Sequence, residues 1–115
     1  MCRELDHNAH LTPIASTRSN SHVQNLARST WGDIPRLWIG AERVTTSNSD
    51  YFQWTTRDPF SFQYWADGEP NNWHDRGEDC VAMQVPNGRW NDDVCTEQYN
   101  FICYKRAYTE NCKAV

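Results

Sequence analysis

Five oxygen-bearing side chains within one short stretch most constrain how this chain can fold. Glu69 and Asn71 stand two residues apart, Glu78 follows seven residues later, and the pair Asn91-Asp92 completes the set. Carboxylate and amide oxygens suit Ca²⁺, which binds about 6–8 oxygen atoms at about 2.3–2.6 Å. If the five side chains converge, the chain holds a calcium ion on a polar surface built from loops. We expect the function of the chain to reside there.

The residues around this set indicate how it could converge. The segment 66–79 is long, polar and without regular periodicity, and such loops are uncommon in compact domains unless they are functional. Its carboxylates repel one another, and a divalent cation would give the loop a centre to fold around. A cis Glu69–Pro70 bond would turn both flanking side chains to the same side. A hairpin turn at 86–88 would return Asn91-Asp92 to the neighbourhood of Glu78.

The order of the predicted elements, helices before short strands, indicates an α+β fold. Residues 1–7 read as the end of a helix, in which Cys2 and Leu5 share a face. A second helix is predicted from a cap at Ser19 or Asn20 through Arg28, with Val23 and Leu26 facing the core. The predicted strands are short apolar or aromatic segments at 37–40, 51–54, 80–85, 89–92 and 99–104.

Composition excludes several classes of protein. With 115 residues the chain is one domain at most. A net charge of −4 without a cluster of Lys or Arg argues against nucleic-acid binding. No apolar run approaches the roughly 20 residues that span a bilayer. Five cysteines in so short a chain favour an oxidising compartment, hence a secreted or extracellular protein, and the alternative of a reduced chain with a zinc site lacks the Cys/His spacing it needs.

Taken in order, several motifs resemble the C-type lectin-like domain. They are Trp-Ile-Gly at 38–40, Glu-Pro-Asn at 69–71, Gly-Glu-Asp-Cys at 77–80, Trp-Asn-Asp at 90–92, Cys95, and Phe-Ile-Cys at 101–103. The resemblance implies two helices packed on short antiparallel sheets, with a long calcium-binding loop. It places this domain at 1–105, followed by a tail at 106–115. Because Met1 falls inside the first helix, we expect the preceding strand and the start of that helix to be missing.

The same resemblance implies disulfides and a ligand set. It pairs Cys2 with Cys103 and Cys80 with Cys95, and leaves Cys112 unassigned. It assigns the calcium ligands as Glu69, Asn71, Glu78, Asn91 and Asp92. Two vicinal sugar hydroxyls would complete the metal's shell, since carboxylates accept hydrogen bonds and amides both donate and accept them. In this family the Glu-Pro-Asn order favours mannose, glucose, N-acetylglucosamine and fucose.

Trp73 keeps the ligand class open. It stands two residues after Asn71, on the rim of the expected site. In galactose-binding members of the family a tryptophan at this spacing stacks on the sugar ring, so galactose is the alternative ligand. Trp73 could equally pack under the loop or shield the calcium.

A second calcium site is not expected. In the family, auxiliary sites draw acidic ligands from the loop after Trp-Ile-Gly. Here that segment, 41–50, has Arg43 and Ser47 where acids would help. We therefore expect one calcium ion.

Two other functional classes remain to be weighed. A structural or interaction module of a larger extracellular glycoprotein is suggested by the unassigned Cys112. An enzyme is disfavoured, because calcium ligands must stay ionised whereas a general acid needs a raised pKa. The expected partners are glycans or glycoproteins. Binding of one monosaccharide at a shallow site is weak, so we expect an oligomer or a larger extracellular assembly.

Overall fold

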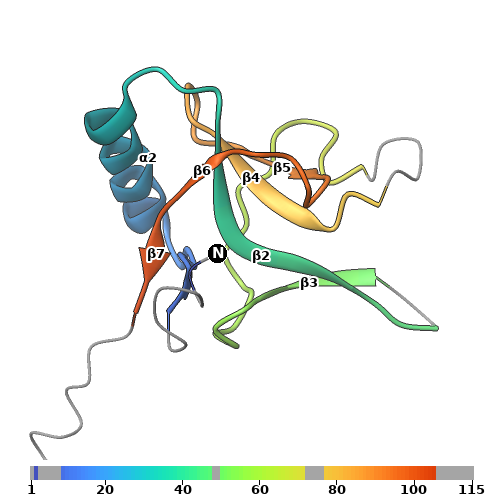
Figure 1. Cartoon of the computed structure of the whole chain (residues 1–115). Helices are drawn as coiled ribbons and strands as arrows, with labels where there is room; N and C mark the ends of the chain where they lie inside the picture. The colour runs from blue at the N-terminus through green and yellow to red at the C-terminus, as the bar shows by residue number, and fades with distance from the viewer. Residues whose placement is uncertain (1, 3–8, 48–49, 72–76, 106–115) are drawn as a thin grey trace, which may run out of the picture.

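The computed structural model describes residues 2, 9–47, 50–71 and 77–105. Their helix and strands, in chain order, are β1 (His10–Leu11), α2 (Thr17–Trp31), β2 (Arg36–Thr45), β3 (Asp50–Trp54), β4 (Cys80–Gln84), β5 (Trp90–Asp93), β6 (Asn100–Phe101) and β7 (Cys103–Tyr104). One sheet has the order β3-β2-β4-β5 with β6 paired to β2, and a second consists of β1 and β7 (Figure 1). The α+β arrangement expected from the sequence is confirmed.

Helix α2 is fixed at both ends by capping. Ser16 caps the start, its side chain accepting from the Ser19 N–H while the Ser19 hydroxyl accepts from the Ser16 N–H. Gly32 ends the helix at φ 78°, where its N–H donates to the Arg28 carbonyl. The predicted start at Ser19 or Asn20 was therefore too late and the predicted end too early. A reciprocal Ser-x-x-Ser cap satisfies two free backbone donors at once, which favours the earlier start.

The buried face of α2 differs partly from the prediction. Asn20, Val23 and Ala27 are buried, whereas Leu26 is 39% exposed. Residues three and four positions apart share a helix face, and Asn20 draws this face toward β5. Its amide accepts from the Trp90 indole N–H at 2.8 Å and donates to the Gly88 carbonyl at 3.0 Å. These two bonds tie the helix to the hairpin that carries Asn91 and Asp92.

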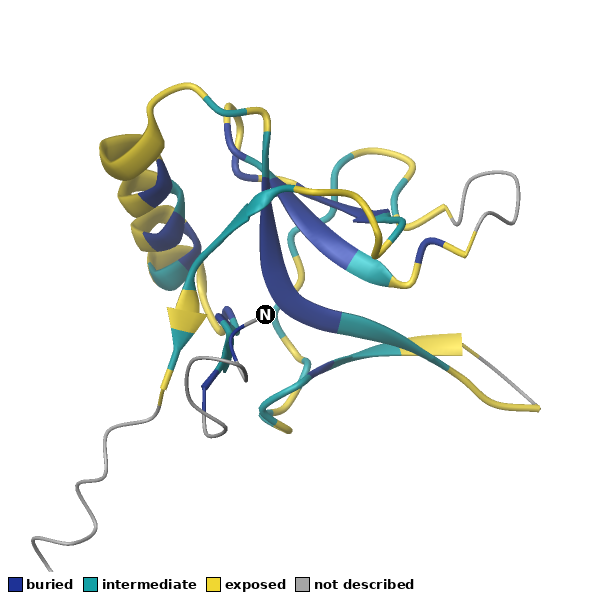
Figure 2. Cartoon of the chain, in the orientation of Figure 1, coloured by how far each residue is buried: buried dark blue, intermediate teal, exposed yellow. Residues whose placement is uncertain are grey.

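Residues of α2, of the larger sheet and of the loop that follows β3 form an aromatic-rich core. Figure 2 shows the buried positions along α2, β2, β4 and β5. Trp54 and Trp90 are fully buried and meet edge to face, 5.6 Å between ring centroids. Trp38 is also buried, while Trp65 is half-buried and packs against Trp90. Three of these four tryptophans are therefore core residues.

Two strand predictions need correction. The segment 41–50, expected as a loop, continues β2 as far as Thr45 and then pairs with β3 in a hairpin. The segment 99–104, expected as one strand, is divided at Ile102 into β6, parallel to β2, and β7, antiparallel to β1. The division arises because the segment serves two sheets: its first half reaches Leu37 and Trp38, and its second half reaches His10 and Leu11.

Both disulfides implied by the resemblance are present. Cys2, a helical residue, joins Cys103 of β7 with a Cα–Cα distance of 5.5 Å. Cys80 of β4 joins Cys95, just after β5, with a Cα–Cα distance of 5.2 Å. The remainder of the expected first helix and Cys112 lie outside the described residues. No helix within the described ranges has the length and apolar character needed to cross a membrane.

Gly40 allows the two sheets to approach. Its N–H donates to the Thr12 carbonyl at 2.9 Å, and a Cβ there would collide with the Leu11 carbonyl oxygen. We expect Gly40→Ala to lower the free energy of unfolding by about 1–3 kcal/mol, as overpacking of a core does. Urea denaturation measures this. Gly32→Ala serves as the control because a Cβ there meets open space and only the positive φ opposes it. An effect at Gly40 no larger than at Gly32 would contradict the collision.

Candidate functional site

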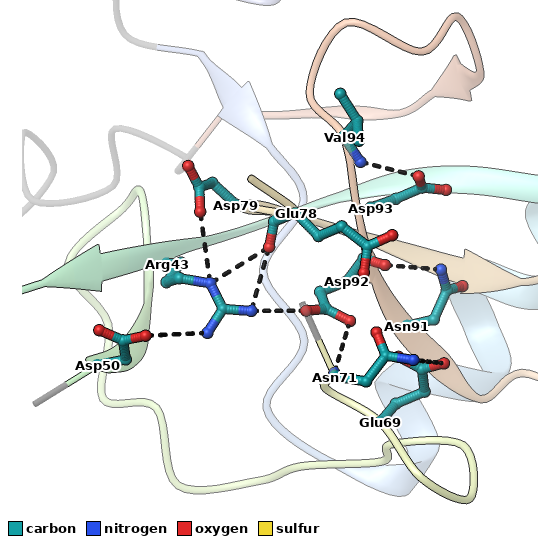
Figure 3. Close-up of polar contacts among 10 residues, drawn as sticks. All are labelled: Arg43, Asp50, Glu69, Asn71, Glu78, Asp79, Asn91, Asp92, Asp93 and Val94. Atoms are coloured by element: carbon teal, nitrogen blue, oxygen red, sulfur yellow. Dashed lines mark hydrogen bonds and ion pairs between the residues drawn. The ribbon is translucent and has the colours of Figure 1, made fainter. Parts of the chain in front are cut away.

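The β4–β5 hairpin and the loop before it bring the five predicted ligands together. Val81 pairs with Asp92 and Ala82 with Asn91, so Glu78, just before β4, lies near the end of β5. Glu69 and Asn71 approach from the loop. Figure 3 shows the Glu69 carboxylate, the Asn71 amide and the side chains of Glu78 and Asn91 grouped beside Asp92. The structure thus brings side chains separated by up to 23 positions into one cluster.

The Glu69–Asn71 segment is attached to β5 by direct contacts. The Glu69–Pro70 peptide bond is cis. The Asn71 backbone N–H donates to Asp92 Oδ1 at 3.0 Å, and the Asn71 amide donates to Glu69 Oε2 at 3.4 Å. Asp92, a residue of β5, therefore also binds the loop, and these hydrogen bonds hold Glu69 and Asn71 at the site.

Two oxygen atoms in the cluster are buried and have no hydrogen-bond donor among the residues that the structure describes. They are Glu69 Oε1 and Asn91 Oδ1. The Asn91 amide is oriented by its nitrogen, which donates to the Asp92 backbone carbonyl at 3.0 Å, so its oxygen is directed away from that bond. A buried acceptor without a partner costs about 1–3 kcal/mol. A cation bound between these atoms would satisfy both.

The cluster is rich in negative charge, and this charge contributes to a raised pKa at Glu69. Burial, followed by a hydrogen bond with the Asp92 carboxyl group and by the charges of Asp92 and Glu78, raises the pKa of Glu69 from 4.5 to about 7. Desolvation and nearby like charges both disfavour the ionised carboxylate. A metal ion at this place would favour the ionised carboxylate and so oppose both effects.

The donor set fits a hard cation. All candidate ligand atoms are oxygens, as calcium requires, and none is a thiolate or imidazole. Within the described part of the chain, no three His, Cys, Asp or Glu side chains are placed to hold a metal on their own. A metal site at Glu69, Glu78 and Asp92 would therefore also require the amide oxygens of Asn71 and Asn91.

Arg43 is a site residue that the sequence analysis did not identify as one. Its side chain, only 8% exposed, extends from β2 into the acidic cluster (Figure 3). It donates to Asp92 Oδ2 at 2.6 Å and to the Glu78 backbone carbonyl at 3.2 and 3.3 Å. Ion pairs to Asp79 at 3.4 Å and Asp50 at 3.5 Å complete its contacts with acidic groups. The available signal was a basic residue in a segment where acidic residues were expected.

The Arg43 guanidinium lies over the face of the Phe52 ring. The guanidinium carbon lies 4.7 Å from the ring centroid, and Phe52 pairs with Arg43 across β2 and β3. Such cation–π contacts favour a cation over the face of the ring. Trp73, the remaining predicted sugar-contacting residue, lies outside the described residues.

Comparisons with known proteins agree with this geometry. The family model described as "Lectin C-type domain" matches residues 1–105. The chain is 33% identical over 92 residues to human "C-type mannose receptor 2" and 28% identical over 102 residues to "Lectin BRA-3" of Megabalanus rosa. These matches cover 80% and 89% of this chain, but only 6% and 59% of the two relatives.

A solved structure supports the fold. The C-type lectin CEL-I from Cucumaria echinata superimposes with a TM-score of 0.74 at 27% identity, covering 83% of this chain and 66% of that one. The C-type lectin-like fold implied by the sequence motifs is thereby confirmed, with its helix packed on antiparallel sheets.

Proposed function

Because this chain belongs to the Lectin C-type domain family, whose members bind carbohydrate, generally with calcium, and are not enzymes, we propose that it binds sugar through one calcium ion held by five of its side chains. The ligands are Glu69, Asn71, Glu78, Asn91 and Asp92. The observation that carries the proposal is a pair of buried oxygens inside an acidic cluster, Glu69 Oε1 and Asn91 Oδ1, which accept no hydrogen bond from the described part of the chain. We assign this function to residues 1–105, with 106–115 as a tail.

The carboxylate and amide side chains of the site have different roles toward the sugar hydroxyls. When bound, the calcium supplies a Lewis acid to which two neighbouring hydroxyl oxygens attach. Glu69 and Glu78 accept hydrogen bonds from the O–H groups of those hydroxyls, because ionised carboxylates act only as acceptors. Asn71 and Asn91 each carry two N–H donors, and one of the Asn91 pair is used by the Asp92 carbonyl. The other can donate to a hydroxyl oxygen.

The Glu-Pro-Asn order at 69–71 supports a ligand with vicinal equatorial hydroxyls, such as mannose, glucose or N-acetylglucosamine, or fucose. The alternative is galactose, with Trp73 stacked on its ring. Inhibition of binding to a mannose-bearing polymer by free monosaccharides tests the order of preference. We expect mannose to inhibit at a lower concentration than galactose. A stronger effect of galactose that disappears in Trp73→Ala would overturn the mannose-type assignment.

The partners we propose are glycans or glycoproteins in a secreted or extracellular setting. A single shallow site gives weak binding, so multivalent presentation by an oligomer or larger assembly would supply the avidity. The chain spans only a small or moderate share of the relatives it matches, and activities of those whole proteins are not carried over.

Calcium binding should weaken as pH falls through neutrality. Calcium requires its carboxylate ligands to be ionised, and the pKa of Glu69 without metal is raised to about 7. Below that pH the site binds a proton that calcium must displace, so calcium affinity should fall steadily from pH 7.5 to pH 5. Calcium titrations across this range, with recovery on return to pH 7.5, measure the effect. Equal affinity at both pH values would contradict it.

The stability of the metal-free protein should change in the opposite sense. The pKa of Glu69 is higher in the folded chain than its ordinary value of 4.5, so between about 4.5 and 7 the folded protein binds a proton that the unfolded chain releases. Stability contributed in this way is present at low pH and is lost as pH rises through the folded pKa. Saturating calcium should remove this trend.

A further inference from the structure

Arg43 brings a fixed positive charge into the acidic cluster. Its guanidinium contacts the carboxylates of Asp50, Asp79 and Asp92 and the backbone carbonyl of Glu78. Asp92 is the most buried of these partners, with a side chain that is 0% exposed. An ionised carboxylate without solvent needs both an opposite charge and hydrogen bonds, and Arg43 supplies the charge at 2.6 Å.

The two oxygens of Asp92 are held from different sides. Oδ2 accepts from Arg43, and Oδ1 accepts from the Asn71 backbone N–H. The carboxylate is therefore fixed in orientation before any metal binds. The same guanidinium also donates hydrogen bonds to the backbone carbonyl of Glu78, the residue whose side chain is a proposed ligand. One side chain thus fixes parts of the site that come from β5 and from the segment before β4.

We propose that Arg43 is a positioning residue for the calcium site: its buried positive charge orients Asp92 and the Glu78 segment. The same charge lies where the surrounding acidic groups would otherwise attract a second metal ion. This inference rests on the proposed function, since it concerns the same site. It differs from a purely structural ion pair because it makes calcium affinity and calcium count depend on Arg43.

The sign of the effect separates this role from simple electrostatics. A guanidinium close to Ca²⁺ repels it, so loss of the charge alone would raise calcium affinity. Loss of orientation acts in the other direction, because groups that orient metal ligands typically change metal affinity by about 10–100-fold when they are replaced. The shared contacts at Asp92 and Glu78 favour the second effect.

The number of calcium ions gives an independent consequence. The guanidinium lies among Asp50, Asp79, Asp92 and the Glu78 carbonyl, which would otherwise form a region of strong negative potential. With this charge in place, a second divalent ion is repelled. The wild-type chain should bind one calcium ion.

The test measures calcium affinity and stoichiometry by titration calorimetry in wild type, Arg43→Met and Arg43→Lys. We expect one ion in wild type and a 10–100-fold loss of affinity in Arg43→Met. Arg43→Lys should fall between them, because lysine keeps the charge but cannot bridge Asp92 and Glu78 with a planar fork. Arg18→Met, on the exposed surface of α2, is the control for loss of one positive charge and should bind calcium as wild type does.

Outcomes that overturn the inference are distinct from failure of the proposed function. Two calcium ions in wild type, or unchanged or tighter binding in a folded Arg43→Met protein, would overturn it. Folding of each variant is checked first by thermal denaturation in EDTA. If Arg43→Met does not fold, the calcium affinity of Arg43→Lys is compared with that of wild type instead. A folded wild-type protein that binds no calcium would instead refute the proposed function, while the contacts of Arg43 could still be tested through stability.

Discussion

Replacing Glu78 with glutamine should abolish calcium-dependent sugar binding. The substitution keeps the size of the side chain but removes a negative charge, and the affinity of an oxygen site for calcium depends on the number of charged ligands. Because replacement of groups that only support a ligand costs about 10–100-fold in metal affinity, we expect a loss of at least about 100-fold at a direct ligand. Calcium titration and binding to a mannose-bearing polymer measure the two parts of this effect.

Glu97→Gln is the matched control for Glu78→Gln. Glu97 is exposed, and its backbone makes two hydrogen bonds: its carbonyl accepts from the Trp38 indole N–H, and its N–H donates to the Val94 carbonyl. The same chemical change there should leave calcium and sugar binding intact. Addition of EDTA to wild type should reproduce the loss seen in Glu78→Gln. Sugar binding that survives both the substitution and EDTA would refute a calcium-mediated site.

The parts of the site that could be predicted are those fixed by short-range sequence patterns. The hairpin turn at 86–88 sets the register in which Asn91 and Asp92 lie opposite Ala82 and Val81. This register determines that Glu78 and Asp92 meet. The loop residues Glu69 and Asn71 were singled out because they lie in a long irregular segment of the kind that is usually functional, and the resemblance to the family implied their role as ligands.

The parts that could not be predicted depend on contacts between distant segments. The boundary of α2 depends on a reciprocal cap between Ser16 and Ser19, whereas the sequence pattern placed the cap at Ser19 or Asn20. Leu26 was expected inside, but the bonds from Asn20 to Trp90 and Gly88 rotate a different face toward the core. A polar residue that selects the buried face of a helix is not visible in hydrophobic periodicity.

Arg43 illustrates the same limit at the site itself. Its spacing from Gly40 showed only that an expected acidic residue was absent. That a basic side chain becomes buried and reaches Asp92, 49 positions away, depends on the path of β2 beside the hairpin. The sequence predicted only that an acidic side chain is missing at this position, and the structure shows that Arg43 instead contacts Asp50, Asp79 and Asp92.

Loss of the Arg43 charge should strongly destabilise the metal-free protein. Arg43→Met leaves Asp92 buried without its cation, and removal of one partner of a buried ion pair costs about 3–5 kcal/mol. We expect a loss of that size in the free energy of unfolding in EDTA at pH 7.5, measured by urea denaturation. Arg18→Met should change it little, because exposed charges contribute about 0–1 kcal/mol.

A double-mutant cycle separates the pair from the rest of the cluster. If Asp92 is the partner that matters, Arg43→Met combined with Asp92→Asn should cost less than the sum of the two single changes, because the Asp92 carboxylate that Arg43 neutralises is then removed as well. Additive losses would instead assign the contribution of Arg43 to Asp50, Asp79 and Phe52.

Calcium should increase the loss of folding stability caused by Arg43→Met. A ligand that binds only the folded state stabilises it according to its affinity, so a variant with weaker calcium binding gains less from the same calcium concentration. Since each tenfold loss of affinity corresponds to about 1.4 kcal/mol, a 10–100-fold loss should enlarge the stability difference from wild type by about 1.4–2.8 kcal/mol at saturating calcium. The two measurements close one thermodynamic cycle. A stability difference that shrinks in calcium would mean that the variant binds calcium more tightly, and that Arg43 opposes the metal rather than positioning its ligands.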